Sequence, residues 1–304
     1  MEFESLFMRI KDGRVERLMG TEFIPPSTDP ETGVSSKDAI IDPTTGVSAR
    51  LFLPRTSNSL KLPILIYFHG GGFCVESPFS PAYHAYVNTL SAELNALAVS
   101  INYRLAPEHP LPTAYNDACT AIKWIDGGQE EWLRDYGDLD RVFLMGDSCG
   151  ANICHQMGMR WSESLFDVKF KGVVLINPYF WGEERIGFEN NEDCKFLGGD
   201  LVKLWHIVCP ELRGYDEAFV NPVGDGAPSL DRLGCERVVV CVAELDPLRE
   251  RGRAYYEKLR ESGWGGVAEF VEVMGEGHVF HLFKPESDKA QDLMKLLVDF
   301  VNHK

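Results

Sequence analysis

Short, almost uninterrupted apolar runs recur along the chain from about residue 48 to its end. Six of them lie at residues 62–68, 96–103, 141–146, 171–177, 237–243 and 269–273. A strand that is apolar on both faces is typical of the centre of a parallel sheet, because crossover helices cover both sides of such a sheet. The six runs therefore predict buried parallel strands.

The segments between these runs carry apolar residues at helical spacing. They cover residues 113–124, 148–161, 247–262 and 285–301. The last is the clearest, because its apolar residues recur along one helical face, at Leu293, Leu296, Leu297, Phe300 and Val301. Strands that alternate with helices predict an α/β fold, with a mostly parallel central sheet and helices on both faces.

Two segments interrupt this alternation. Residues 1–45 are rich in Pro, Gly, Asp and Thr, with a strand-like stretch at Met8–Ile10, and residues from about 179 to 232 mix aromatics, helices and turns. An insertion at the latter position would lie over the carboxyl edge of the sheet, where ligands bind in such folds. We therefore expect one domain over residues 1–304, in which both segments contribute to a helical cap. Loops and satellite helices without a gating role are the alternative.

Composition and charge narrow the class of protein. The 304 residues carry a formal net charge of −16, and 44% of them are hydrophobic. An acidic surface repels phosphate backbones and anionic lipid headgroups, so nucleic-acid and membrane-surface binding are disfavoured. No stretch approaches the roughly 18 apolar residues of a membrane-spanning helix, and the first residues have no basic and apolar leader pattern. We expect a cytosolic protein, whose oligomeric state the sequence leaves open.

The cysteines do not form a metal-binding or disulfide pattern. None of the eight is part of a Cys-x-x-Cys pair, and several, such as Cys241, lie inside apolar runs. Buried free cysteine behaves as a small hydrophobic residue. We therefore expect reduced thiols, with no metal and no organic cofactor.

A nucleophile motif follows the third apolar run. Residues 146–150 read Gly-Asp-Ser-Cys-Gly, between a predicted strand and a predicted helix. In this context a Gly-x-Ser-x-Gly sequence makes a sharp, strained turn that presents the serine hydroxyl at the top of the sheet. Ser148 is therefore the candidate nucleophile.

A glycine-rich loop follows the first of the six runs. Residues 69–73 read His-Gly-Gly-Gly-Phe, about 80 residues before Ser148. Backbone N–H groups on such a loop stabilise the negative charge that develops on a carbonyl oxygen during acyl transfer. Glycine lets the carbonyl approach closely. The amides of Gly71, Gly72 and Cys149 are the predicted oxyanion donors, and His69 is expected to hold the loop. A purely structural turn is the alternative.

The general base should be a histidine after the last strand, because hydrolases of this kind follow the chain order Ser, Asp, His. His278 fits, and His281 is its rival, although the apolar sequence around His281 favours packing. The remaining histidines lie at the wrong places for this order: His84, His109, His155, His206 and His303.

The acid should follow the preceding strand. Asp246 begins a loop before Pro247, and Glu244 lies closer to the strand. A carboxylate at this place accepts the Nδ1 proton of the histidine and turns its Nε2 toward the serine. We prefer Asp246 and keep Glu244 as the alternative. Asp147 and Asp117 are expected to be buried structural acids.

At these motifs the chain resembles the plant carboxylesterases of the hormone-sensitive-lipase-like branch of the α/β-hydrolases. The resemblance extends to nearly the whole chain through residues 11–17, 69–73, 103–112, 146–152 and 277–283. It implies the α/β-hydrolase fold, the same triad and the same oxyanion glycines. One departure is Cys149, where alanine is common in the family.

Three related groups of proteins in this family have other functions. The chain is similar to 2-hydroxyisoflavanone dehydratases through residues 180–182 and 282–286, but these have Thr where this chain has Ser148. Alkaloid-forming cyclases have lost triad members, and gibberellin receptors lack the histidine. The resemblance therefore implies hydrolysis of a small-molecule carboxylic ester. A lyase or cyclase acting on a flavonoid- or alkaloid-type metabolite is one alternative, and a hormone-binding receptor the other.

The substrate pocket is the least readable part of the sequence. Aromatic residues near the motifs and in the predicted cap are its candidates, with core packing as the alternative for each: Phe73, Phe180, Trp181 and Trp205.

Overall fold

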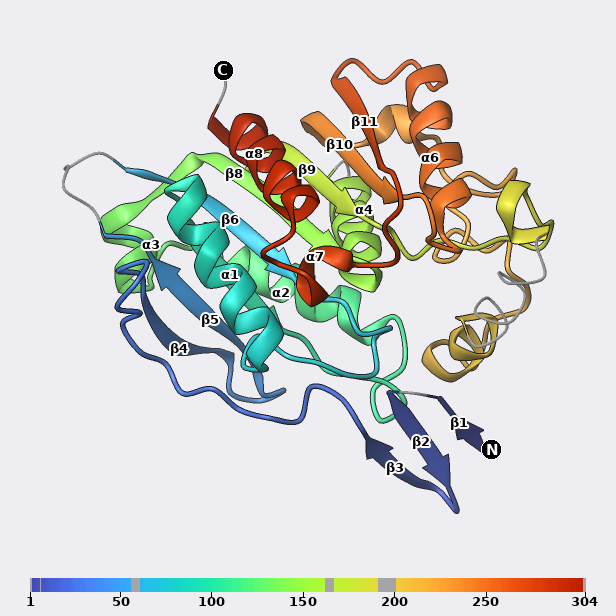
Figure 1. Cartoon of the computed structure of the whole chain (residues 1–304), viewed down its shortest axis with the longest axis horizontal. Helices are drawn as coiled ribbons and strands as arrows, with labels where there is room; N and C mark the ends of the chain where they lie inside the picture. The colour runs from blue at the N-terminus through green and yellow to red at the C-terminus, as the bar shows by residue number, and fades with distance from the viewer. Residues whose placement is uncertain (1, 6, 56–60, 162–166, 191–200, 303–304) are drawn as a thin grey trace.

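A single eight-stranded sheet forms the centre of the molecule (Figure 1). The computed structural model describes all residues except 1, 6, 56–60, 162–166, 191–200 and 303–304. The strand order is β11–β10–β9–β8–β6–β7–β5–β4. The strands span β4 Ser35–Asp42, β5 Val47–Leu53, β6 Leu62–Phe68, β7 Leu97–Asn102, β8 Gly137–Asp147, β9 Phe170–Ile176, β10 Cys235–Ala243 and β11 Val267–Val273.

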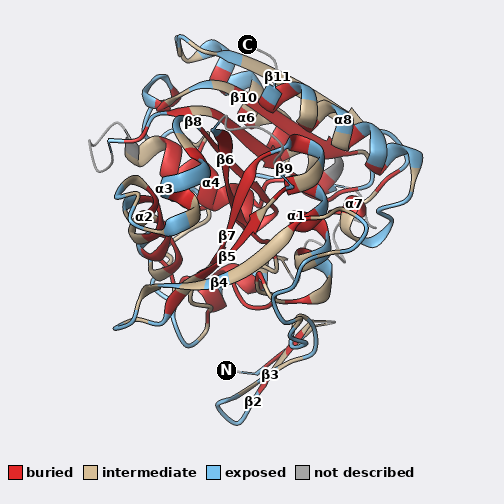
Figure 2. Ribbon diagram, turned by 90° about the vertical axis from the view of Figure 1, so that its left-hand side faces the viewer, coloured by how far each residue is buried: buried red, intermediate tan, exposed pale blue. Residues whose placement is uncertain are grey.

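The six apolar runs form the parallel part of this sheet. Strands β6 to β11 pair with one another in parallel, as their apolar sequences predict. Successive side chains of β6 enter different cores: Ile64 and Ile66 pack on one face of the sheet, and Leu65 and Tyr67 on the other. Figure 2 shows these central strands as buried. The mostly parallel central sheet expected from the sequence is therefore present.

Two further strands extend the sheet on one side. β5 pairs antiparallel with β7, and β4 pairs antiparallel with β5 at the edge of the sheet. Most of β4 is only half-buried (Figure 2), because it is the edge strand of the sheet. In the described part of the chain its outer side bonds only residues 27–28, through the Ser35–Thr28 bridge and the Ser36 amide, which donates to Ser27 O at 2.7 Å. Residues 35–42 therefore belong to the central sheet, and the expectation that all of residues 1–45 contribute to a cap is wrong for this stretch.

Helices cover both faces of the sheet. α1 Pro81–Leu94, α7 Phe280–Phe283 and α8 Asp288–Asn302 lie on the face that contains Leu65 and Tyr67 (Figure 1). The other face packs against α2 Thr113–Asp126, α4 Cys149–Trp161 and α6 Arg249–Glu261, with α3 Glu131–Tyr136 leading into β8. Helical spacing in the sequence predicts α2, α4, α6 and α8, but it does not predict α1.

A small antiparallel sheet precedes the main one. It consists of β1 Phe3–Glu4, β2 Met8–Lys11 and β3 Arg14–Arg17, which lie apart from the central sheet in Figure 1. Arg17 ties it to the body, because its Nε donates to the carbonyl oxygen of Cys74 at 2.7 Å and its guanidinium pairs with Glu108. The N-terminal sheet is thereby attached to the loop that follows β6.

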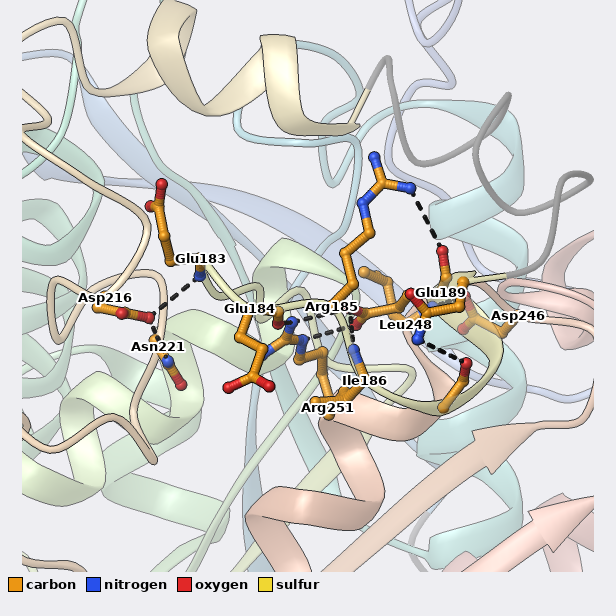
Figure 3. Close-up of polar contacts among 12 residues, drawn as sticks. Glu183, Glu184, Arg185, Ile186, Glu189, Asp216, Asn221, Asp246, Leu248 and Arg251 are labelled. Atoms are coloured by element: carbon orange, nitrogen blue, oxygen red, sulfur yellow. Dashed lines mark hydrogen bonds and ion pairs between the residues drawn. The ribbon is translucent and has the colours of Figure 1, made fainter.

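The segment between β9 and β10 contains short helices and loops. Its described elements are η1 Gly187–Asn190, a helical stretch at residues 201–208 and η2 Leu230–Arg232. A buried ion pair fastens its first part to α6: Arg251 Nε lies 2.6 Å from Glu189 Oε1, and the two side chains are only 5% and 0% exposed (Figure 3). Arg251 also donates to the carbonyl oxygen of Glu184.

Within the described part of the chain, no helix combines the length and the apolar character needed to cross a membrane. The cysteines in this part are all free thiols, and Cys194 lies outside it.

Removing one partner of the Arg251–Glu189 pair should destabilise the protein strongly. The Glu189→Gln variant leaves the buried guanidinium without its counter-charge, which typically costs about 3–5 kcal/mol. Chemical denaturation followed by circular dichroism measures this loss. Asp292→Asn, which breaks the exposed Lys295–Asp292 pair, is the control and should leave the unfolding midpoint unchanged. An equally small effect of both variants would contradict this account of the ion pair.

Candidate active site

Functional side chains from four loops meet at the carboxyl edge of the parallel strands. Ser148 follows β8, the glycine-rich loop follows β6, Asp246 follows β10 and His278 follows β11. The parallel direction of these strands brings their carboxyl ends to one edge.

Ser148 occupies a sharp turn between β8 and α4. It is the single residue between the end of β8 at Asp147 and the start of α4 at Cys149, and its φ is 53°. For a residue with a side chain this left-handed conformation is strained. Backbone hydrogen bonds hold it: the amide of Ser148 donates to Ile176 O at 2.9 Å, and its carbonyl accepts from the amide of Tyr179 at 3.0 Å.

The flanking glycines are needed because the turn is closely packed. A Cβ on Gly150 would lie 1.9 Å from the carbonyl oxygen of Phe68, and one on Gly146 would lie 2.5 Å from the carbonyl carbon of Gly150. Neither position has room for any side chain. The Gly-x-Ser-x-Gly pattern is thus explained by contacts between the turn and β6.

Asp246 and His278 form a hydrogen-bonded pair. His278 Nδ1 lies 2.8 Å from Asp246 Oδ2, and the Asp246 side chain is fully buried. Leu248 N also donates to this carboxylate at 2.9 Å (Figure 3), as does Asn177 Nδ2 at 2.6 Å. A buried carboxylate needs such donors for its remaining lone pairs. Sequence reasoning missed Asn177, whose only local signal is its position at the end of an apolar run.

The rival acid has a different partner. Glu244 Oε2 accepts a hydrogen bond from the amide of Gly275 at 2.7 Å, so it braces the loop before His278. The geometry thus separates the two carboxylates that the sequence left open, and the one bonded to the imidazole is Asp246.

His278 has a raised pKa. Burial alone would lower it, but the charge of Asp246, the hydrogen bond that His278 donates to that carboxylate and the charge of Asp147 outweigh burial and raise the pKa above 6.5. No hydrogen bond of the described residues joins His278 to Ser148 Oγ; such bonds often tighten only with substrate bound.

His281, the rival histidine, packs against α1. His281 is 2% exposed, contacts the ring of Tyr86 at a centroid distance of 4.8 Å, and has no hydrogen-bond partner among the described residues. Burial lowers its pKa to about 3, so it stays neutral. His281 therefore forms no hydrogen bond with Asp246 or Glu244 in the described residues.

The remaining histidines lie away from the pair formed by His278 and Asp246. His84 contacts Arg50, His155 contacts Tyr255 and His206 contacts Tyr215 through ring nitrogens. The backbone amide of His109 donates to Leu105 O at 2.9 Å. His303 lies outside the described residues.

The glycine-rich loop adopts a backbone conformation that residues with a side chain rarely adopt. Gly71 has a φ of 97° and Gly72 a φ of 60°, and Gly71 O accepts from the amides of Cys74 and Val75 at 3.0 Å. A Cβ on Gly71 would lie 2.3 Å from Val75 O, and one on Gly72 would lie 2.5 Å from the side chain of Leu204. The helical stretch at residues 201–208 thus packs directly on this loop.

Cys149 connects the loop with the serine turn. Its Sγ accepts a hydrogen bond from the amide of Phe73 at 3.1 Å, and its pKa is raised to about 12 by burial, against opposing hydrogen bonds that include the Gly72 amide. The thiol is therefore protonated and unreactive at neutral pH. Its own amide lies at the first turn of α4, where N–H groups have no partner within the helix.

His69 lies in the core beneath the loop. Its ring stacks on Tyr103 at a centroid distance of 4.4 Å, and its Nδ1 lies 2.8 Å from Gly70 O. Burial lowers its pKa to about 4. The Tyr103 hydroxyl donates to His69 O at 2.8 Å. These contacts are structural, as expected from the sequence.

Two buried acids lie near the motifs. Asp117 pairs with Arg104 at 2.6 Å. Asp147, fully buried beside Ser148, accepts from the hydroxyls of Tyr67 and Tyr83, each at 2.7 Å. Burial raises the pKa of Asp147 to about 6, although both tyrosines and the charge of His278 oppose the shift.

The four candidate pocket aromatics are all buried, with at most 4% of each exposed. Trp205 packs on Phe73 and Tyr179, next to the glycine-rich loop. Phe180 stacks on Tyr255 of α6, and Trp181 lies against Arg251. Phe73 and Trp205 are therefore close to the site, whereas Phe180 and Trp181 pack toward α6.

In the described residues, no cluster of three or more His, Cys, Asp or Glu side chains has the arrangement of a metal site. The candidate side chains at this edge are the hydroxyl of Ser148, the imidazole of His278 and the carboxylate of Asp246.

Comparisons with known proteins agree with this geometry. A family model described as the alpha/beta hydrolase fold matches residues 65–282. The chain is 49% identical to probable carboxylesterase 2 of Arabidopsis thaliana, over 96% of this chain and 92% of that protein. It is 46% identical to the tuliposide A-converting enzyme b2 of Tulipa gesneriana, over 96% of this chain and 76% of that protein.

Solved structures place it in the same group. A thermostable carboxylesterase cloned from a metagenomic library has a TM-score of 0.72 at 27% identity and covers 88% of both chains. An esterase of Pyrobaculum calidifontis has a TM-score of 0.74 at 26% identity, over 88% of this chain and 84% of that one. With its fold, its serine turn and these relatives, the chain belongs to the carboxylesterase family of α/β-hydrolases.

Proposed function

We propose that this protein is a serine carboxylesterase that hydrolyses carboxylic esters through an acyl-enzyme on Ser148. The observation that carries the proposal is the 2.8 Å bond between His278 and the buried carboxylate of Asp246, at the same sheet edge as the strained serine turn. Acyl transfer requires a general base oriented by an acid, together with a hydroxyl nucleophile within its reach.

The first half of the reaction forms the acyl-enzyme. Ser148 Oγ attacks the ester carbonyl carbon while His278 Nε2 takes the hydroxyl proton. The π electrons of the C=O bond move to the carbonyl oxygen, which becomes the oxyanion. The negative charge of Asp246 stabilises the imidazolium. Collapse of the tetrahedral intermediate breaks the bond to the alkoxy oxygen, which receives the proton from His278 and leaves as an alcohol.

The second half releases the acid. Water attacks the acyl carbon and gives a proton to His278, and the second tetrahedral intermediate collapses with return of that proton to Ser148 Oγ. The carboxylic acid leaves and the enzyme is restored. No step needs a metal or an organic cofactor.

The oxyanion of both intermediates is assigned to the amides of Gly71, Gly72 and Cys149. The first two lie on the loop with positive φ, and the third lies at the start of α4, where the helix favours negative charge.

The cap is proposed to shape the substrate pocket. Residues 201–208 support this role, because Leu204 contacts Gly72 and Trp205 packs on Phe73. We infer a substrate class of short-chain esters or esters of plant specialised metabolites, in line with the tulip relatives that are named for converting tuliposide A. A single domain over residues 1–304, with a cap built from about 179–232 and from the part of residues 1–45 that precedes β4, remains part of this proposal.

A cytosolic location is proposed from the sequence. Several tulip relatives are named as amyloplastic or chloroplastic enzymes, and this chain covers 76–78% of their length. Fluorescence of a full-length fusion in plant cells tests the location, and signal confined to plastids would contradict it.

Ser148→Ala should abolish ester cleavage. Loss of the nucleophile typically lowers kcat by about 10⁴-fold or more, which a p-nitrophenyl acetate or butyrate assay measures. A serine-directed organophosphate should label the wild-type protein at Ser148 and should not label the variant. A wild-type protein that cleaves neither ester and escapes labelling would refute the proposal. Retained turnover of a hydroxyisoflavanone by the variant would favour a lyase.

The pH dependence should follow the imidazole. Because His278 must be neutral to accept the proton and its pKa is raised above 6.5, kcat/KM should fall as pH decreases through a midpoint above that value. Asp246→Asn removes the negative charge, so the midpoint should move to lower pH and kcat should drop by about 10²–10⁴-fold.

Glu244→Gln is the matched control for Asp246→Asn. Its amide oxygen can still accept from Gly275, so both kcat and the midpoint should stay within error of the wild type. If Glu244→Gln shifted the midpoint and Asp246→Asn did not, the acid would be Glu244.

A further inference from the structure

The glycine-rich loop is held at both ends by hydrogen bonds that its backbone amides donate. At its far end the amide of Phe73 donates to Cys149 Sγ at 3.1 Å. At its near end the amide of Gly70 donates to the Tyr83 hydroxyl of α1 at 2.8 Å. The amides of Gly71 and Gly72 lie between these two attachments.

The Tyr83 hydroxyl makes a second, stronger contact. It donates to Asp147 Oδ2 at 2.7 Å, and both side chains are almost completely buried, with Tyr83 3% exposed and Asp147 0% exposed. A hydroxyl has one proton, and an N–H can only donate. The proton of Tyr83 therefore goes to the carboxylate, and its lone pair is left for Gly70.

These two bonds connect the loop with the nucleophile. Asp147 directly precedes Ser148, so the path from Gly70 through Tyr83 to Asp147 reaches the backbone of the serine turn. The junction is tight: a Cβ on Gly70 would lie 2.4 Å from Asp147 Oδ2 and 2.7 Å from the Tyr83 hydroxyl. A small movement of Tyr83 would therefore move the loop relative to Ser148.

We propose that Tyr83 is a positioning residue for ester hydrolysis, whose hydroxyl sets the distance between the oxyanion donors and Ser148. This inference rests on the proposed function. Oxyanion donors act only within about 2.7–3.1 Å of the developing charge, and a misplacement of about 1 Å is enough to slow a reaction by roughly a hundredfold. The loop stabilises the transition state more than the bound ester, so its displacement should reduce kcat with little change in KM.

Tyr67 provides a matched control. Its hydroxyl donates to the other oxygen of the same carboxylate, also at 2.7 Å, and its side chain is fully buried on the same face of the sheet. Among the described residues its hydroxyl bonds only Asp147. Tyr67→Phe and Tyr83→Phe thus each remove one hydrogen bond from Asp147, but only Tyr83→Phe also releases Gly70.

The experiment compares the two variants with the wild type. Steady-state kinetics with p-nitrophenyl butyrate should show a kcat lowered about tenfold in Tyr83→Phe, with KM within about twofold, and a kcat within about twofold in Tyr67→Phe. Affinity for a trifluoromethyl ketone, whose serine adduct carries an oxyanion, should fall in parallel with kcat. Thermal unfolding should show that both variants fold, with the larger loss of stability in Tyr83→Phe, which also leaves the Gly70 amide without its acceptor.

Hydrogen exchange measured by mass spectrometry gives a readout that does not depend on activity. The peptide that covers the glycine-rich loop should exchange faster in Tyr83→Phe than in Tyr67→Phe, because the Gly70 amide has lost its acceptor. Equal exchange in the two variants would overturn the proposed attachment.

The outcomes separate this inference from the proposed function. A wild-type protein without esterase activity overturns both. An active wild type with kcat equally retained, or equally lowered, in Tyr83→Phe and Tyr67→Phe overturns the role of Tyr83 alone. If Tyr83→Phe does not fold, 3,5-difluorotyrosine at position 83 keeps the ring and the donor but weakens the oxygen as an acceptor. It should still lower kcat several-fold, and an unchanged kcat would overturn the inference.

Discussion

The site depends on one constraint: the turn between β8 and α4 is packed so closely that its flanking glycines have no room for a side chain. One residue connects the strand with the helix, and glycine must lie on both sides of it because any Cβ would collide with the backbone nearby. The three residues of the turn therefore point in different directions. Asp147 bonds Tyr67 of β6 and Tyr83 of α1, Ser148 follows the carboxyl end of β8, and the Cys149 thiol bonds the Phe73 amide of the glycine-rich loop. A single strained turn thus fixes the nucleophile and contacts the elements that serve it.

The parallel sheet brings the other residues of the site to the same edge as the serine turn. Because parallel strands end at one edge, residues more than a hundred positions apart in the sequence meet there without long connections. This is why the motifs were readable from the sequence: each lies directly after an apolar run, and the order Ser, Asp, His follows from the order of the strands. Strands β6 to β11 were predictable for a related physical reason, since burial on both faces leaves an almost continuous apolar sequence.

Elements with a weaker pattern were missed. β4 is a polar, half-exposed edge strand without apolar alternation. In α1, Tyr83, Val87 and Leu90 do recur at helical spacing, but buried polar residues such as Asn88 and Ser91 obscure the pattern. The hydrogen bonds from Asn177 to Asp246 and from Tyr83 to Asp147 join residues 69 and 64 positions apart. No local rule encodes such pairs, and only the packing of the folded chain separates Asp246 from Glu244.

The central claim is that the serine turn presents Ser148, and not the adjacent cysteine, as the attacking group. Rapid quenching of the reaction with p-nitrophenyl acetate, followed by intact-mass and peptide mass spectrometry, tests it most directly. The account predicts an acetyl adduct that appears within the first turnover and maps to Ser148, because burial keeps the Cys149 thiol protonated. An adduct on Cys149, or hydrolysis without any covalent adduct under conditions in which deacylation is slow, would contradict it.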